Sequence, residues 1–225
     1  MKKNQSGMTL IELLIVFVIF GLLVGILIWN FDRYKQNDNL RSAAENLAQD
    51  IRTAQTNAFS GKTVQVGTDE SESVPIGGYG VHFDIPGMGD NKYLIFADRE
   101  RYTAMGCETI RDFRYNYGYC SDDCTEDTDN SDYALPPPVI SLPKDIVISK
   151  IEFAGIPDVQ QQIVDITFFP PQSRVRLGRE VPCGITEVIV DNVEITLTHN
   201  VTGLEKIVKV IGASGQISVI SGTSP

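Results

Sequence analysis

Residues 7–31 read Gly7-Met-Thr-Leu-Ile-Glu-Leu-Leu-Ile-Val-Phe-Val-Ile-Phe-Gly-Leu-Leu-Val-Gly-Ile-Leu-Ile-Trp-Asn-Phe31. The nineteen residues from 13 to 31 carry no charge, and as a helix they would span roughly 28 Å. A bilayer hydrocarbon core is about 30 Å thick, so this length predicts a membrane helix. Glu12 lies at the amino-terminal end of this predicted helix. An unpaired carboxylate there is costly, so its presence indicates a function. A cut after Gly7 would give Glu12 a partner, the new amino group of Met8.

The run Lys2-Lys-Asn-Gln-Ser-Gly-Met-Thr-Leu-Ile-Glu-Leu13 resembles the leader of type IV prepilins and type II secretion pseudopilins. In that family a membrane peptidase cleaves after the glycine and methylates the new amino terminus. The resemblance implies that Gly7 is the cleavage residue, Met8 the methylated residue and Glu12 the assembly carboxylate. Met8 stands where the family more commonly has phenylalanine. The implied partners are prepilin peptidase, other pilin or pseudopilin subunits, and membrane lipid.

Two other interpretations of this segment remain open. A secretory signal peptide also has a basic start and an apolar middle, but Glu12 interrupts the start of the apolar region. The apolar region ends with Ile28-Trp-Asn-Phe-Asp-Arg33, which contains no small-x-small cleavage site. A plain single-pass anchor would need only the apolar run.

The charge flanking the apolar run predicts its orientation. Lys2 and Lys3 place the amino terminus in the cytoplasm, and residues beyond Phe31 outside it. We therefore expect a single-pass protein of the bacterial inner membrane that later enters a pseudopilus or pilus. The sequence predicts four parts: a cleaved leader at 1–7, a transmembrane and assembly half-helix at 8–31, an amphipathic half-helix at 32–60, and an extracytoplasmic β-rich domain at 61–225.

Gly21 and Gly25 form a Gly-x-x-x-Gly pair inside the apolar run. Such a pair allows two helices to approach closely. It is also compatible with a locally weakened helix, because glycine costs about 1 kcal/mol relative to alanine. Small residues are common in membrane helices, so neither function is required.

One continuous helix is predicted from Met8 to Phe59, because no proline or glycine interrupts residues 26–60. Gly61 is well placed as its terminator. The second half has an apolar stripe at spacings of three and four, which predicts burial against a β-domain. The stripe comprises Leu40, Ala44, Leu47, Ile51, Ala54 and Ala58.

Beyond Gly61 the pattern changes to short β-branched and aromatic runs that predict antiparallel strands. The predicted strands are Thr63–Val66, Tyr79–Phe83, Tyr93–Ala97, Ile146–Phe153, Ile163–Phe169, Arg174–Leu177, Glu187–Thr198, Ile207–Ile211 and Gln216–Ile220. The predicted class is α+β, a long amino-terminal helix packed on an antiparallel sheet or sandwich. Residues Gly78–Asp84 and Lys92–Asp98 also resemble minor pseudopilins of the H type, both in amino-acid sequence and in their order along the chain.

An acidic insertion with cysteines is predicted at about residues 105–138. Asp127, Asp129 and Asp132 offer oxygen ligands suited to calcium. The spacing lacks an EF-hand pattern, and a solvated acidic loop is the favoured interpretation. No other cofactor is expected. Four cysteines on the extracytoplasmic side are disulfide candidates whose pairing stays open, and a zinc site would need more convergent ligands. They are Cys107, Cys120, Cys124 and Cys183.

No enzyme motif is present: Gly-x-Ser-x-Gly, a P-loop and His-Glu-x-x-His are all absent. His82 and His199 are interpreted as strand or hairpin residues, and we expect no catalytic activity. The formal net charge of −10 opposes nucleic-acid binding through a broadly basic surface. The first hypothesis is a structural minor pseudopilin or pilin. An adhesive or DNA-uptake pilin and a membrane-anchored β-domain with another binding or enzymatic role are the alternatives.

Overall fold

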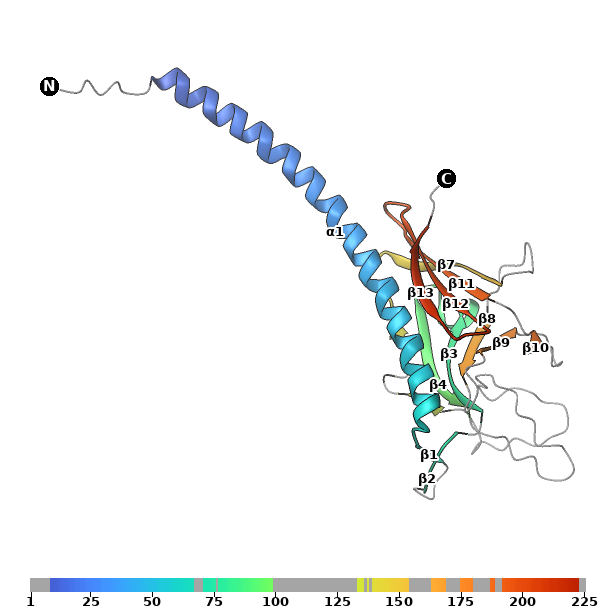
Figure 1. The fold of residues 1–225 in the computed structure, drawn as a ribbon. Coiled ribbons are helices and arrows are strands. Elements are labelled where there is room, and N and C mark those ends of the chain that lie inside the picture. The colour runs from blue at the N-terminus through green and yellow to red at the C-terminus, as the bar shows by residue number, and fades with distance from the viewer. Residues whose placement is uncertain are drawn as a thin grey trace, which may run out of the picture. The chain divides into compact units, whose positions relative to one another are not determined.

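The computed structural model describes most of the helix and the β-strands of the chain (Figure 1). The described residues are 9–66, 71–75, 77–98, 133–135, 137, 139–153, 163–168, 175–179, 187–188 and 192–222. The chain divides into two compact units, Met1–Asn39 and Leu40–Pro225.

Helix α1 runs from Leu10 to Ser60 and confirms the predicted continuous helix. Its carboxyl end is closed by Gly61, which adopts a left-handed conformation with φ of 60°. The amide of Gly61 donates to the carbonyl of Ala58, and the amide of Lys62 donates to the carbonyl of Asn57. This is the Schellman pattern, in which glycine avoids the strain that a Cβ would cause at positive φ.

The strands form two main antiparallel sheets and one short pair, so the class is α+β as predicted. The larger sheet has the order β10-β9-β8-β3-β4-β5, with β6 paired to β4, and the smaller sheet has the order β13-β12-β11-β7. The strands of the larger sheet are β3 (Gly78–Asp84), β4 (Lys92–Asp98), β5 (Tyr133–Ala134), β6 (Ile140–Ser141), β8 (Ile163–Phe168), β9 (Val175–Arg179) and β10 (Glu187–Val188). Those of the smaller sheet are β7 (Ile146–Phe153), β11 (Asn192–His199), β12 (Glu205–Ile211) and β13 (Ile217–Ser221). The short pair consists of β1 (Val64–Val66) and β2 (Ser71–Ser73), and a one-turn helix α2 (Ile85–Met88) follows β3.

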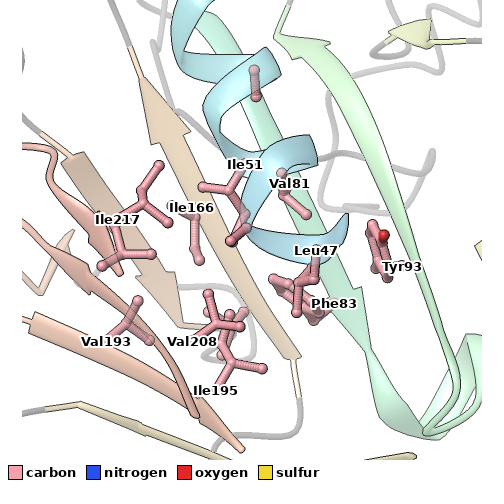
Figure 2. Close-up of a cluster of buried hydrophobic side chains, with 14 of the residues drawn as sticks. Leu47, Ile51, Val81, Phe83, Tyr93, Ile166, Val193, Ile195, Val208 and Ile217 are labelled. Atoms are coloured by element: carbon pink, nitrogen blue, oxygen red, sulfur yellow. The ribbon is translucent and has the colours of Figure 1, made fainter. Parts of the chain in front are cut away.

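The second half of α1 and both main sheets contribute to one hydrophobic core. The six residues of the predicted stripe are at most 1% exposed, which confirms the assignment of the buried face. Figure 2 shows Leu47 and Ile51 of α1 beside Val81 of β3 and Ile166 of β8, with Val208 of the smaller sheet in the same cluster. Burial of apolar surface from three separate elements is the main stabilising contribution to this unit.

The prediction of a single strand from Glu187 to Thr198 is wrong. Glu187 and Val188 pair with β9 in the larger sheet, whereas β11 starts at Asn192 and pairs with β7 and β12 in the smaller one. Alternating side chains identify the strand conformation but do not identify the sheet that each part joins. The buried face of β11, at Val193, Ile195 and Leu197, agrees with the predicted alternation.

No helix in the described part of the chain is both long enough and apolar enough to cross a membrane.

Candidate functional site

The start of α1 is held by a reciprocal set of hydrogen bonds between Thr9 and Glu12. The backbone amide and the hydroxyl of Thr9 each donate to Oε2 of Glu12 at 2.8 Å. In return, the amide of Glu12 donates to Oγ1 of Thr9 at 3.4 Å. This is a capping box, in which two side chains satisfy amides that a helix terminus would leave without partners. The Thr-x-x-Glu spacing is the sequence signal of such a box, so Glu12 caps the helix in addition to its predicted assembly role.

The capping box fixes where the Glu12 carboxylate lies. Oε2 of Glu12 accepts from the backbone nitrogen of Thr9, the residue that directly follows Met8. Cleavage after Gly7 would create an amino group one residue away along the backbone, at the i−4 position relative to Glu12. Gly7 and Met8 themselves lie outside the described residues, so the predicted cleavage and methylation sites stay predictions.

The first half of α1 exposes apolar side chains around its surface. The large apolar residues from Leu10 to Phe20, together with Leu22, Leu23 and Ile26, are 48% to 83% exposed. A soluble helix normally shows one apolar stripe and one polar face. An all-round apolar surface is typical of helices that are covered by lipid or by other helices.

Gly21 and Gly25 lie within this apolar segment. Apart from the adjacent residues and the backbone of the helix itself, a Cβ added at either position would meet no described atom within 4 Å. Among the described residues, their small size is therefore not required by packing within the chain. The predicted close approach of a second helix, a locally weakened helix, and no special role all remain open.

The predicted calcium and disulfide residues all lie outside the described part of the chain. They are Asp127, Asp129, Asp132, Cys107, Cys120, Cys124 and Cys183. Within the described residues, no group of three or more histidine, cysteine, aspartate or glutamate side chains is arranged to hold a metal.

Both histidines are buried in the β-sheets. Nδ1 of His82 in β3 lies 2.7 Å from Oδ1 of Asp165, its register partner in β8. Nδ1 of His199, at the end of β11, accepts the amide of Val201 at 3.3 Å within the hairpin turn. These contacts agree with the interpretation of both residues as strand or hairpin residues.

A second polar site, absent from the sequence-based predictions, joins α1 to β4. The hydroxyl of Tyr93 donates to Oδ2 of Asp50 at 2.6 Å. Burial raises the pKa of Tyr93, and the hydrogen bond and negative charge of Asp50 raise it further. The phenol therefore stays protonated and acts as the donor. The two residues are 43 positions apart, so no local pattern could have paired them.

Comparison with known families gives one result. Residues 2–28 match the family model of the prokaryotic N-terminal methylation motif. No curated protein and no solved structure matches the chain. The match supports a type IV pilin-like precursor, a substrate of prepilin peptidase that assembles with pilin subunits.

Proposed function

We propose that this chain is a minor structural subunit of a type II secretion pseudopilus or of a type IV pilus-like fibre. The main support is the methylation motif at residues 2–28, combined with the position of Glu12 in the first turn of α1. A cleavage signal, a positioned carboxylate and an exposed apolar helix are the three parts that assembly through a helix requires. The β-rich unit is proposed to have a structural role without catalysis.

In the proposed mechanism, the apolar run from 13 to 31 holds the precursor in the inner membrane with its amino end in the cytoplasm. Prepilin peptidase cleaves after Gly7 and methylates Met8. The new ammonium group then pairs with Glu12 of a neighbouring subunit, or with Glu12 of the same chain. In apolar surroundings an unpaired carboxylate is costly, so this pairing favours one register between subunits. The apolar halves of the helices pack together, and the β-rich units face outward.

Within this class we favour the secretion pseudopilus. The support is the similarity of residues Gly78–Asp84 and Lys92–Asp98 to H-type pseudopilins. These residues form β3, which lies at the centre of the larger sheet, and its neighbour β4. Loss of protein export from a strain that lacks this chain, with surface pili unchanged, would support secretion; the reverse result would support a pilus.

The test of processing is Gly7→Ala, measured by electrophoretic mobility and by sequencing of the amino terminus after co-expression with prepilin peptidase. We expect the wild type to begin at Met8 and the variant to keep its leader, because the peptidase requires glycine before the cut. Gly21→Ala is the matched control and should be processed normally. Complete cleavage of Gly7→Ala, or an uncleaved wild type, would contradict the proposal.

A further inference from the structure

Three stretches of α1 differ in what supports their helical conformation. Residues 13–26 are all apolar or glycine, and from Leu40 onward the apolar stripe of the helix is buried in the core of the β-rich unit. Between these stretches, Tyr34 is 73% exposed, and residues 35–39 are exposed except for the half-buried Gln36. Residues 35–39, here called the polar turn, are polar throughout, and no described element buries them.

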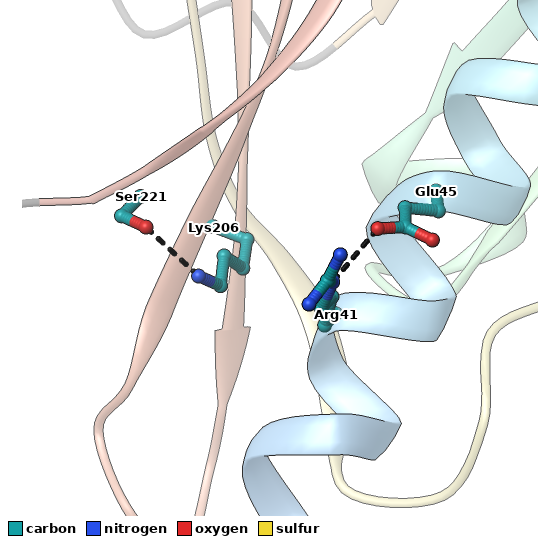
Figure 3. Close-up of polar contacts among 4 residues, drawn as sticks. All are labelled: Arg41, Glu45, Lys206 and Ser221. Carbon is teal, nitrogen blue, oxygen red and sulfur yellow. Dashed lines mark hydrogen bonds and ion pairs between the residues drawn. The ribbon is translucent and has the colours of Figure 1, made fainter.

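The residues of the polar turn also have a weak preference for the helix. Asn37, Asp38 and Asn39 follow one another directly, and asparagine and aspartate are poor helix formers whose side chains compete for backbone hydrogen bonds. Among the described residues, no side chain of the polar turn makes a hydrogen bond or ion pair that would offset this preference. Such contacts resume at Arg41, which pairs with Glu45 one turn later at 2.8 Å (Figure 3).

The polar turn is the part of α1 where the helix can open at the lowest cost. A short helical stretch in water is only marginally stable without tertiary packing. If the apolar run lies in lipid, as proposed above, an opening there would leave backbone groups without water to bind. An opening after Leu40 would expose the buried apolar stripe. In the polar turn, by contrast, water can satisfy the freed backbone groups directly.

We infer that the polar turn is a hinge, which uncoils locally and lets the β-rich unit reorient on its apolar segment. A hinge needs only a few residues that absorb the change in backbone angles. The boundary between the two compact units follows this turn directly, after Asn39. The hinge would serve a subunit that leaves the bilayer for a fibre, where its β-rich unit meets new neighbours. The inference rests on the proposed function for this purpose, and not for the opening itself.

The first experiment follows amide hydrogen exchange of the full chain in detergent micelles by NMR, residue by residue. We expect the amides of residues 37–39 to exchange at least about tenfold faster than those of residues 47–51, because local opening exposes the turn without exposing the core. The triple variant Asn37→Ala, Asp38→Ala, Asn39→Ala should slow exchange in the turn by about thirtyfold, because alanine is the strongest helix former. All three positions are exposed, so the variant should leave the β-rich unit folded.

Asn46→Ala is the matched control, because Asn46 is an exposed residue of the packed half of α1. It should leave exchange in the polar turn unchanged. Wild-type amides in the turn that are as well protected as those of residues 47–51 would overturn the inference. Fast exchange that the triple variant does not slow would overturn it as well. This measurement needs no cleavage at Gly7, so its result is independent of the proposed processing.

The second experiment measures bending directly, with spin labels carried by unnatural amino acids at positions 26 and 53. A straight continuous helix would hold these backbone positions about 40 Å apart. The wild type should give a broad distribution of distances that extends to shorter values, and the triple variant should give one narrow peak. A narrow wild-type peak at the distance of a straight helix would contradict a hinge.

The triple variant also tests the purpose of the hinge in cells. It should be cleaved normally, because residues 7–12 are unchanged, and should enter sheared fibres several-fold less than the wild type. Asn46→Ala should be incorporated like the wild type. Equal incorporation of the triple variant and the wild type would contradict a role of the hinge in assembly. A wild type that is never cleaved would contradict the proposed function, whereas the exchange result would still decide whether the turn opens.

Discussion

At the scale of single residues, Glu12 combines two roles that can be separated. Its carboxylate completes the capping box with Thr9 and is also the acidic group that the proposed assembly requires. Removal of a cap costs a helix about 1 kcal/mol. Loss of the charge would remove the ion pair with the new amino terminus, which nothing else in the first turn replaces, because Glu12 is the only acidic residue there.

We therefore expect different effects from Glu12→Leu and Thr9→Ala. Both variants lose the capping box, but only Glu12→Leu loses the carboxylate. Glu12→Leu should be cleaved normally and fail to enter fibres, whereas Thr9→Ala should be cleaved and incorporated. Fractionation of sheared fibres with immunoblotting measures incorporation. Equal incorporation of Glu12→Leu and wild type would rule out the assembly role.

Tyr79 gives the folded unit a dependence on alkaline pH. Its hydroxyl donates to the carbonyl of Lys62 at 2.7 Å, and burial raises the pKa of Tyr79 to about 12. An unfolded tyrosine has a pKa of about 10. The folded state therefore keeps its proton over a range in which the unfolded state loses it, so stability is retained below pH 10 and falls as the pH rises towards 12.

Urea unfolding midpoints between pH 8 and pH 12 test this dependence. The wild-type midpoint should fall above about pH 10, and Tyr79→Phe should fall less steeply. Tyr34→Phe is the control, because Tyr34 is 73% exposed, and it should follow the wild type. Identical slopes for Tyr79→Phe and wild type would show that Tyr79 does not cause the loss.

At the scale of elements, local periodicity predicted α1 and most strands, but not the pairing of strands. The stripe at Leu40, Ala44 and Leu47 repeats at helical spacing and has one available partner, the sheet domain. The run from Glu187 to Thr198 has strand spacing throughout, yet its two ends join different sheets. Sheet membership depends on contacts with distant strands, which a local pattern does not contain. The two-residue strands β5 and β6 are too short to produce a periodic signal.

At Gly80, in the centre of β3, atoms of the two neighbouring strands lie too close to leave room for a Cβ. A Cβ at Gly80 would lie 2.5 Å from Cζ of Phe96 in β4 and 2.8 Å from the carbonyl oxygen of Ile166 in β8. Phe96 is fully buried, so its ring cannot move into solvent. Overpacking of this kind costs about 1–3 kcal/mol.

Gly80→Ala should lower the free energy of unfolding by about that amount, 1–3 kcal/mol, as measured by urea denaturation. Gly21→Ala is the control, because the added methyl group would meet no described atom within 4 Å apart from the adjacent residues and the backbone of its own helix. It should leave the unfolding of the β-rich unit unchanged. Equal midpoints for Gly80→Ala and wild type would mean that the sheet accommodates a Cβ at this position.

At the scale of the whole molecule, the two units differ in what surrounds their side chains. The unit from Leu40 buries the apolar stripe of the second half of α1 in the core that its sheets also form. The unit before it leaves apolar residues such as Leu10 and Phe17 exposed, at 83% and 66%. The sequence predicted a change within the helix after Phe31, where charged residues begin, whereas the compact units divide after Asn39. The contact between Asp50 and Tyr93 could not be predicted, because it depends on tertiary packing.

The central claim is that the chain is a precursor whose new amino terminus, next to Glu12, directs assembly. Intact mass spectrometry of the protein purified from its native membrane tests this claim most directly. We expect a mass that corresponds to residues 8–225 with one added methyl group. A mass that corresponds to the full chain from Met1, with no shortened species, would contradict it.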